Sequence, residues 1–169
     1  NIDNETYAIE SKYDSTGNVI EMKYPDGESI FYEHDELGRI KKIPGYFEGP
    51  NLNNNAFAYD KVGNLISVYG LNGINTEYKY DLLGRLTEID SEPIYLKYSY
   101  DANGNIQTIN NLNTEVVLNY EYDGLNRLIK ADIKKSNGVE NISYSYDGIG
   151  NRILEIYYNL NNEVINQKY

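Results

Sequence analysis

Seven aspartates recur at regular spacing, and a carboxylate can bind metal or take part in acid–base chemistry. They are Asp14, Asp35, Asp60, Asp81, Asp101, Asp123 and Asp147. A Ca²⁺ site needs several oxygen ligands from one loop, and a glycosidase needs two carboxylates at a fixed separation. Most of these loops offer one carboxylate, followed shortly by Asn or Arg. The pattern therefore favours aspartates that cap turns by accepting a backbone N–H two residues later, rather than a metal site.

Basic side chains stand close to these aspartates. The chain has four arginines, Arg39, Arg85, Arg127 and Arg152. The first three stand four residues after one of these aspartates, and Arg152 stands five residues after Asp147. Along the copies the position four residues after the aspartate alternates between Asn and Arg. A ladder that contacts anions or glycans is one interpretation. The favoured interpretation is that each Arg pairs with a turn aspartate or stacks on a Tyr ring of the neighbouring strand.

Other residue types exclude several kinds of active site. The chain has no Cys, which removes disulfides, thiolate metal sites and cysteine nucleophiles. Its single His, His34, leaves no His pair for zinc and little scope for a His-based triad. Nothing fixes the separation of carboxylate pairs such as Asp26 with Glu28. We therefore expect no catalytic residue, no metal and no cofactor, and we expect His34 to be a packing substitution for Tyr.

The aspartates belong to an internal repeat that must position them. Seven copies begin at residues 13, 34, 59, 80, 100, 122 and 146. Each copy reads aromatic or His, Asp, two variable residues, Gly or Asn, then Asn or Arg. Asp-x-x-Gly fits a type I turn followed by a residue in the left-handed region, which joins two strands of a hairpin. Asn126 replaces the Gly once, and Asn is the next best residue for that conformation.

Strands are expected on both sides of each turn. An aromatic residue usually stands two before the Tyr, which places both rings on one face of a strand. A second turn lies between copies, most clearly at Pro25-Asp26-Gly27, with others near 90–93, 110–113 and 136–138. Residues 44–55 form the longest loop. Turns every ten residues or so predict an all-β, up-and-down antiparallel meander with almost no helix, and the Tyr rings are expected to fill its inner face.

Apolar residues after the turns do not alternate as a strand requires. They recur at i and i+3, as in Leu86 with Ile89 and Ile106 with Ile109. That spacing is helical, but these segments are short, β-branched and bounded by turns. A β-bulge or partial burial of both faces would reconcile the pattern with a strand, and the sequence does not choose between them.

Length and charge set further bounds. The chain has 169 residues, enough for a single domain over 1–169 with a core of its own, and a net charge of −11. Such an acidic chain is not expected to bind nucleic acid, and no apolar run approaches the roughly 20 residues of a membrane span. The chain begins Asn1-Ile2-Asp3 without an initiator Met or an apolar signal stretch. We therefore expect a fragment of a longer chain, with any targeting signal outside it.

The tandem Tyr-Asp-x-x-Gly-Asn/Arg-Leu pattern resembles the YD repeat of the Rhs family. This family includes bacterial Rhs and wall-associated polymorphic toxins, the C components of insecticidal toxin complexes, and teneurins. The resemblance runs from Tyr13 to Arg152. It implies a curved or spiralling antiparallel sheet that forms part of a hollow β-shell, which encloses a toxic domain in toxin members. No Asp-Pro pair occurs in the chain, so the family's autoproteolytic core segment is absent from it.

The resemblance makes the repeat residues structural rather than catalytic. The expected structural residues are Tyr13, Asp14, Gly17, Asp35, Gly38, Arg39, Tyr59, Asp60, Gly63, Tyr80, Asp81, Gly84, Arg85, Tyr100, Asp101, Gly104, Tyr122, Asp123, Asn126, Arg127, Tyr146, Asp147 and Gly150. The expected function is a non-catalytic scaffold in a large secreted or surface-exposed bacterial protein. The alternative is a glycan-binding or adhesion module that uses outward Tyr and Asn residues.

The expected partners follow from this function. They are the rest of the parent chain and an enclosed toxin domain or, under the alternative, a cell-surface glycan. The isolated segment is also expected to self-associate through edge strands near Thr6 to Lys12 and near Val164 to Tyr169, because an open meander leaves unpaired backbone groups at both ends.

Overall fold

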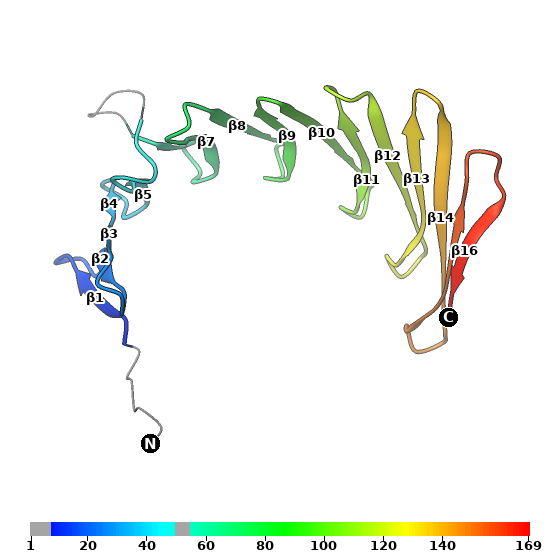
Figure 1. The fold of residues 1–169 in the computed structure, drawn as a ribbon, viewed down its shortest axis with the longest axis horizontal. Helices are drawn as coiled ribbons and strands as arrows, with labels where there is room; N and C mark the ends of the chain where they lie inside the picture. Colours follow the sequence, from blue (N-terminus) through cyan, green and yellow to red (C-terminus); the bar gives the residue numbers. More distant parts are fainter. Residues whose placement is uncertain (1–7, 50–54) are drawn as a thin grey trace, which may run out of the picture. The chain divides into compact units, whose positions relative to one another are not determined.

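The computed structural model describes residues 8–49 and 55–169, and these ranges consist of strands and turns without a helix. Figure 1 shows the strands as successive arrows joined by loops. The described residues therefore contain no helix long and apolar enough to cross a membrane. The chain divides into two compact units, Asn1–Glu77 and Tyr78–Tyr169, and each is described by itself. The predicted all-β antiparallel meander is confirmed.

The first unit contains the earliest copies in short strands. A three-stranded sheet has the order β1-β2-β3, and a two-stranded sheet pairs β4 with β5. The bounds are β1 (Glu10–Tyr13), β2 (Val19–Lys23), β3 (Ser29–Phe31), β4 (Glu33–His34), β5 (Ile40–Lys42), β6 (Phe57–Tyr59) and β7 (Leu65–Tyr69), and β8 (Asn75–Tyr80) begins in this unit. Thr6 and residues 50–54 of the predicted long loop lie outside the described residues.

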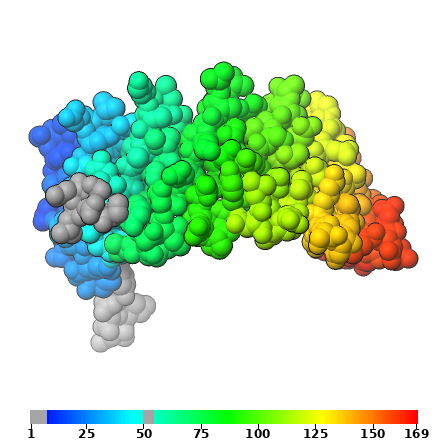
Figure 2. Space-filling view, turned by 90° about the horizontal axis from the view of Figure 1, so that it is seen from above, coloured from blue at the N-terminus to red at the C-terminus, as the bar shows by residue number. Residues whose placement is uncertain are grey.

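The second unit carries the longer strands. They are β9 (Leu86–Ser91), β10 (Ile94–Tyr100), β11 (Ile106–Asn111), β12 (Val116–Tyr122), β13 (Leu128–Lys135), β14 (Gly138–Tyr146), β15 (Arg152–Tyr158) and β16 (Val164–Lys168). Each pairs with its neighbours in sequence, within an 11-stranded sheet that runs from β6 to β16. Figure 2 shows residues 78–169 in sequence order from green to red.

A β-bulge follows the turns of the copies and explains the apolar spacing. Ser99 pairs with Thr108, but Tyr100 pairs with Ile106, so Gln107 has no opposite residue. Because one residue is skipped, Ile106 and Ile109 lie on the same face although they are three apart. The same slip occurs between β12 and β13 and between β14 and β15. Of the two explanations that the sequence left open, the bulge is the one found.

The two faces of the sheet differ in chemistry. On one face, Tyr98 lies opposite Ile109, which lies opposite Leu118 on the next strand. On the other face, Ser99 lies opposite Thr108, whose hydroxyl is 2.7 Å from that of Ser99. Directly paired residues of antiparallel strands share a face, so an aromatic and aliphatic face lies back to back with a polar one.

The sheet has no conventional core. Among the described residues the buried hydrophobic side chains are Ala56 and Ala131, and the buried polar one is Glu155. The Tyr rings of the repeats, such as Tyr98 and Tyr120, are half-buried. The expectation of a core of its own is therefore wrong for the described residues. Chain length predicts burial only when elements stack in layers, and a single sheet layer leaves both faces open.

Candidate functional site

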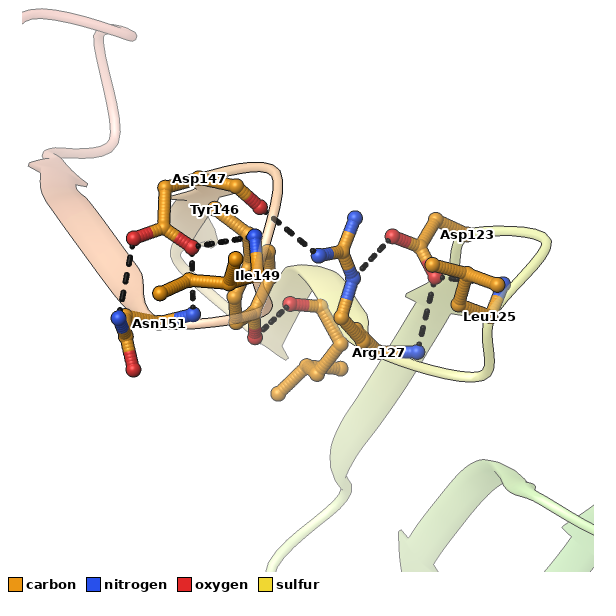
Figure 3. A network of polar contacts seen from close by, with 8 residues as sticks. Asp123, Leu125, Arg127, Tyr146, Asp147, Ile149 and Asn151 are labelled. Atoms are coloured by element: carbon orange, nitrogen blue, oxygen red, sulfur yellow. Dashed lines mark hydrogen bonds and ion pairs between the residues drawn. The ribbon is translucent and has the colours of Figure 1, made fainter.

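The repeated turns hold most of the residues that could carry chemistry, and each turn is organised by its aspartate. In copy 6 the N–H of Asp123 donates to the carbonyl of Arg127 at 2.9 Å, and the N–H of Asn126 donates to the carbonyl of Asp123 at 3.0 Å. One carboxylate oxygen of Asp123 accepts the N–H groups of Leu125 and Arg127 at 2.9 and 3.0 Å (Figure 3). The carboxylate thereby satisfies backbone donors that a tight turn leaves without partners.

The residue after the turn Gly occupies the second carboxylate oxygen. Arg127 Nε donates to Asp123 Oδ2 at 2.7 Å, and Asn151 Nδ2 donates to Asp147 Oδ2 at 3.0 Å (Figure 3). The same bond is made by Asn18, Arg39, Asn64, Arg85 and Asn105 to their own aspartates, at 2.7 to 3.0 Å. Asn and Arg alternate at this position because both place an N–H donor at the same oxygen.

The turn glycines have a backbone conformation that side chains rarely adopt. Their φ angles lie between 76° and 99° in Gly17, Gly38, Gly63, Gly84, Gly104 and Gly150. Asn126 holds the same place with φ of 60°. Its Oδ1 also accepts the side-chain N–H groups of Asn103 at 3.1 Å and Asn105 at 2.9 Å, both from the preceding copy. Asn126 therefore shapes its own turn and contacts the neighbouring turn.

These hydrogen bonds stabilise the ionised aspartates. The backbone N–H of Arg127 and then its guanidinium lower the pKa of Asp123, against partial desolvation. The side-chain amide of Asn105 lowers the pKa of Asp101 in the same way. The pKa is also lowered at Asp14, Asp35, Asp60, Asp81 and Asp147. Carboxylates that accept several N–H bonds are held in the charged form and are poor general acids at neutral pH.

The motif tyrosines of copies 3, 5, 6 and 7 connect each of these copies to the one before it. The hydroxyl of Tyr122 donates to the carbonyl of Ile106 at 2.9 Å, and that of Tyr146 donates to the carbonyl of Leu128 at 2.7 Å. Equivalent bonds are Tyr59 to Ile40 at 2.8 Å and Tyr100 to Leu86 at 2.6 Å. In each case the acceptor directly follows the Asn or Arg of the preceding copy. We call this copy-to-copy bond the tyrosine link.

Arginine adds a second connection in copies that carry it. The guanidinium carbon of Arg39 lies 4.5 Å from the centroid of the Tyr59 ring, that of Arg85 lies 4.5 Å from Tyr100, and that of Arg127 lies 4.6 Å from Tyr146. Arg127 Nη1 also lies 3.4 Å from the carbonyl of Asp147 (Figure 3). Each of these arginines therefore pairs with its own aspartate and stacks on the next copy's ring, so both favoured contacts are made at once.

Arg152 differs from the other three arginines. It lies one position later in its copy, 3.2 Å from Glu155 and with its guanidinium carbon 5.5 Å from the Tyr144 ring centroid. Both Arg152 and Glu155 stand where other copies have an apolar pair. The aromatic face of copy 7 therefore carries an ion pair, and Glu155 is the buried polar residue already noted.

The remaining sequence candidates lie apart from any convergent site. Asp26 accepts the N–H of Glu28 within a turn, and Glu33 pairs with Lys41 and Lys42. Within the ranges that the structure describes, no group of three or more His, Asp or Glu residues is placed to hold a metal ion. Tyr13 lies at the end of β1 and is 59% exposed, and Tyr80 ends β8.

Turns with the same backbone bonds also lie outside the seven copies, among them residues 43–47. At Asn159 the N–H donates to the carbonyl of Glu163, and Asn162 has φ of 60° and donates to the carbonyl of Asn159. Residues 24–28 and 70–74 close in the same way. The signal in the sequence is Tyr158-Asn159-x-x-Asn162, in which Asn replaces both Asp and Gly. Turns of this kind therefore also occur between the recognised copies.

Several solved structures share the fold of this chain. The crystal structure of TcdB2–TccC3 superimposes with a TM-score of 0.81 at 19% identity, and covers 97% of this chain and 10% of that one. TcdB2–TccC3 without the hypervariable C-terminal region gives 0.76 at 21% identity, covering 91% and 9%. The Photorhabdus luminescens Tc holotoxin pore, with a mutation in TccC3, gives 0.75 at 20% identity, covering 90% and 9%.

The solved structures and the family model match the chain over different lengths. The chain spans about a tenth of the length of the solved chains, and at this identity the similarity shows the fold. No curated protein matches the chain. The Teneurin YD-shell family matches residues 46–163, which include copies 3 to 7 and their turns. With that match over more than half of its length, the chain belongs to the Teneurin YD-shell family.

Proposed function

We propose that this chain is a non-catalytic scaffold, a wall segment of the β-shell in a large secreted or surface-exposed bacterial protein. The observation that carries this proposal is the tyrosine link, which joins one copy to the next, as Tyr122 does with Ile106. A wall must transmit its geometry from copy to copy. A link from copies 3, 5, 6 and 7 to the backbone of the previous copy does this without a core.

The state of the polar groups also supports a structural role. The carboxylate of Asp123 is occupied by three N–H donors from its own turn, and Arg127 is held between Asp123 and the Tyr146 ring. Groups engaged in this way have little capacity left for substrate. The same engagement weighs against the glycan alternative, because the rings of Tyr59, Tyr100 and Tyr146 are covered by arginine on one face.

The scale of the relatives supports a role within a longer wall. The solved chains are about ten times as long as the part of them that this chain matches. We therefore infer that residues 1–169 act as a single repeat domain within a larger shell, and that the shell encloses a toxin domain. The partners are then the rest of the parent chain and that enclosed domain, and the place of action is outside the producing cell.

Electron microscopy of the whole parent protein tests this proposal. We expect a hollow particle whose wall includes this stretch of hairpins, and an enclosed domain that resists protease until the particle is denatured. A solid or extended particle would contradict the shell. Binding of the purified chain to a glycan array, abolished by substitution of exposed Tyr and Asn residues but not by loss of the tyrosine links, would favour the adhesion alternative.

A further inference from the structure

The junction between copies 1 and 2 lacks the tyrosine link that Tyr59, Tyr100, Tyr122 and Tyr146 make at theirs. His34 stands where Tyr is found in the other copies, and imidazole has no phenol hydroxyl to donate. The equivalent acceptor would be the carbonyl of Val19, which follows Asn18. Within the described part of the chain the His34 side chain makes no hydrogen bond. The tyrosine link is therefore missing at this junction.

The arginine contact is missing there as well, as it is between copies 5 and 6, where copy 5 carries Asn105. Copy 1 carries Asn18, which bonds Asp14 at 3.0 Å but cannot stack as a guanidinium does. The junction between copies 2 and 3 is a useful contrast, since it too separates two sheets. That junction nevertheless has the Tyr59 link at 2.8 Å and the Arg39 guanidinium over the Tyr59 ring.

The space around His34 is open on two sides. His34 lines a hollow of about 730 Å³ together with Asp14, Asn18 and Ile20 of copy 1. It also lines a second hollow of about 480 Å³ that extends to Asn55. The His34 side chain is thus reached by solvent as well as unlinked.

The backbone pairing across this junction is short. The three-stranded sheet β1-β2-β3 and the pair β4-β5 are separate sheets. Between the end of β3 and the start of β4, Tyr32 donates its N–H to the carbonyl of Ile20 at 3.0 Å. Across the junction itself β2 and β3 have three residue pairs in register, against four between β11 and β12 at the junction of copies 5 and 6.

We propose that this junction is a built-in opening point, at which β1–β3 separate from β4 and the following copies as one cooperative unit. His34 creates the opening point because it removes the link that tyrosine supplies in copies 3, 5, 6 and 7. Regions with few packed contacts open at lower free energy than the rest of a structure. Copy 1 can therefore detach from or rejoin the wall without disturbing copies 5 to 7.

Native-state hydrogen exchange of the full chain tests the proposal. We expect the amides of β2 and β3 to exchange together, at least about tenfold faster than those of β11 and β12, as expected for a separately opening unit. The variant His34→Tyr should slow exchange in β2 and β3 by about fivefold, the factor that one net hydrogen bond provides, and leave β11 and β12 unchanged.

A matched variant controls for fraying at a chain end. Tyr122→His creates the same gap between copies 5 and 6, away from either end of the sheet, and should speed exchange in β11 by a similar factor. Exchange in β2 as slow as in β12 in the unmodified chain would overturn the proposal. So would unchanged exchange in a folded His34→Tyr variant, because opening would then not depend on the missing link.

Discussion

Tyr146 donates its hydroxyl hydrogen to the backbone carbonyl of Leu128, 18 residues earlier, at 2.7 Å. The two residues stand in successive copies, and the bond crosses from the strand before one turn to the strand after the previous turn. The Arg127 guanidinium carbon lies 4.6 Å from the centroid of the same ring. One tyrosine thereby connects the hydrogen-bonding and stacking contacts of two copies, in a sheet layer where buried apolar groups are few.

Loss of one tyrosine link should be measurable. We expect Tyr122→Phe to lower the free energy of unfolding by about 0.5–1.5 kcal/mol, because it removes one net hydrogen bond and leaves the Ile106 carbonyl without this donor. Urea denaturation monitored by circular dichroism measures the change. Tyr13→Phe is the matched control at an exposed position, and its effect should stay within about 0.5 kcal/mol. Equal effects of the two variants would contradict a stabilising role for the link.

The turn position of Gly84 should tolerate little besides glycine. A Cβ there would meet nothing within 4 Å, so the penalty comes from φ of 76° and not from a clash. We expect Gly84→Val to destabilise by about 1–3 kcal/mol, because a β-branched residue is poorly accommodated at positive φ. Gly84→Asn should cost less, since Asn tolerates that region.

Asn126→Gly provides the reciprocal test. It relieves a positive φ but removes the oxygen that accepts bonds from Asn103 and Asn105. The two effects oppose each other at an exposed site, so we expect a change within about 0.5 kcal/mol. Thermal melts that ranked Asn126→Gly as more damaging than Gly84→Val would show that neighbouring-turn contacts outweigh backbone strain.

Stability should fall in acid because of the turn aspartates. Their pKa is lower in the folded chain than the ordinary value near 3.9 in the unfolded chain. The unfolded state therefore binds more protons in this range, so the contribution is full above about pH 5 and is lost as pH falls through the lowered values. Urea midpoints measured between pH 7 and pH 3 should decline steeply below about pH 4.

A variant assigns this acid dependence to the turns. Asp123→Asn cannot ionise at that position, so we expect lower stability at pH 7 and a shallower decline toward pH 3. Glu121→Gln, at an exposed strand position, is the matched control and should keep the original slope. An unchanged slope in Asp123→Asn would mean that other carboxylates dominate the acid response.

Arg127 has a contact with its own Asp123 and contacts with copy 7 that substitution can separate. In Arg127→Asn the amide keeps a donor for Asp123, as Asn105 does for Asp101, but the contact with the Tyr146 ring is lost. We expect a decrease of about 0.5–1 kcal/mol, mainly from the lost cation–π contact, since the Nη1 contact with the Asp147 carbonyl is long at 3.4 Å. Arg127→Ala removes all of these contacts and should destabilise more. Equal unfolding midpoints for the two variants would show that the bond to Asp123 adds nothing.

The turns could be predicted from sequence because their chemistry is local. Asp101 and Gly104 lie three residues apart. The aspartate accepts backbone N–H groups of the turn, and the glycine adopts the positive φ that the turn requires. The bulge at Gln107 was foreseen only as one of two options, since the spacing of Ile106 and Ile109 fits both. The tyrosine link carried no signal, because its acceptor is a backbone carbonyl 14 to 19 residues earlier that any residue type supplies.

The edge strands are the last feature with a measurable consequence. β16 ends the 11-stranded sheet and has β15 as its neighbour in the described residues, so one side of its backbone is open. Val164, Ile165 and Tyr169 are 55%, 64% and 93% exposed. In the three-stranded sheet of the described residues β1 is also an edge strand. Ile9, beside it, is 58% exposed. Open edges of this kind template further strand pairing.

We therefore expect the isolated chain to self-associate through these edges. The net charge of −11 opposes close approach, but salt at 0.15 M shortens the reach of that repulsion to about 8 Å. Association measured by light scattering should then strengthen with added salt, because repulsion weakens while strand pairing and burial of Tyr169 persist. Ile165→Lys should oppose it by placing a charge on the edge, whereas Val62→Lys, the same change at an 85% exposed turn position, should not. A monomer at every salt concentration, with freely exchanging β16 amides, would show that edge pairing is too weak to hold copies of this chain together.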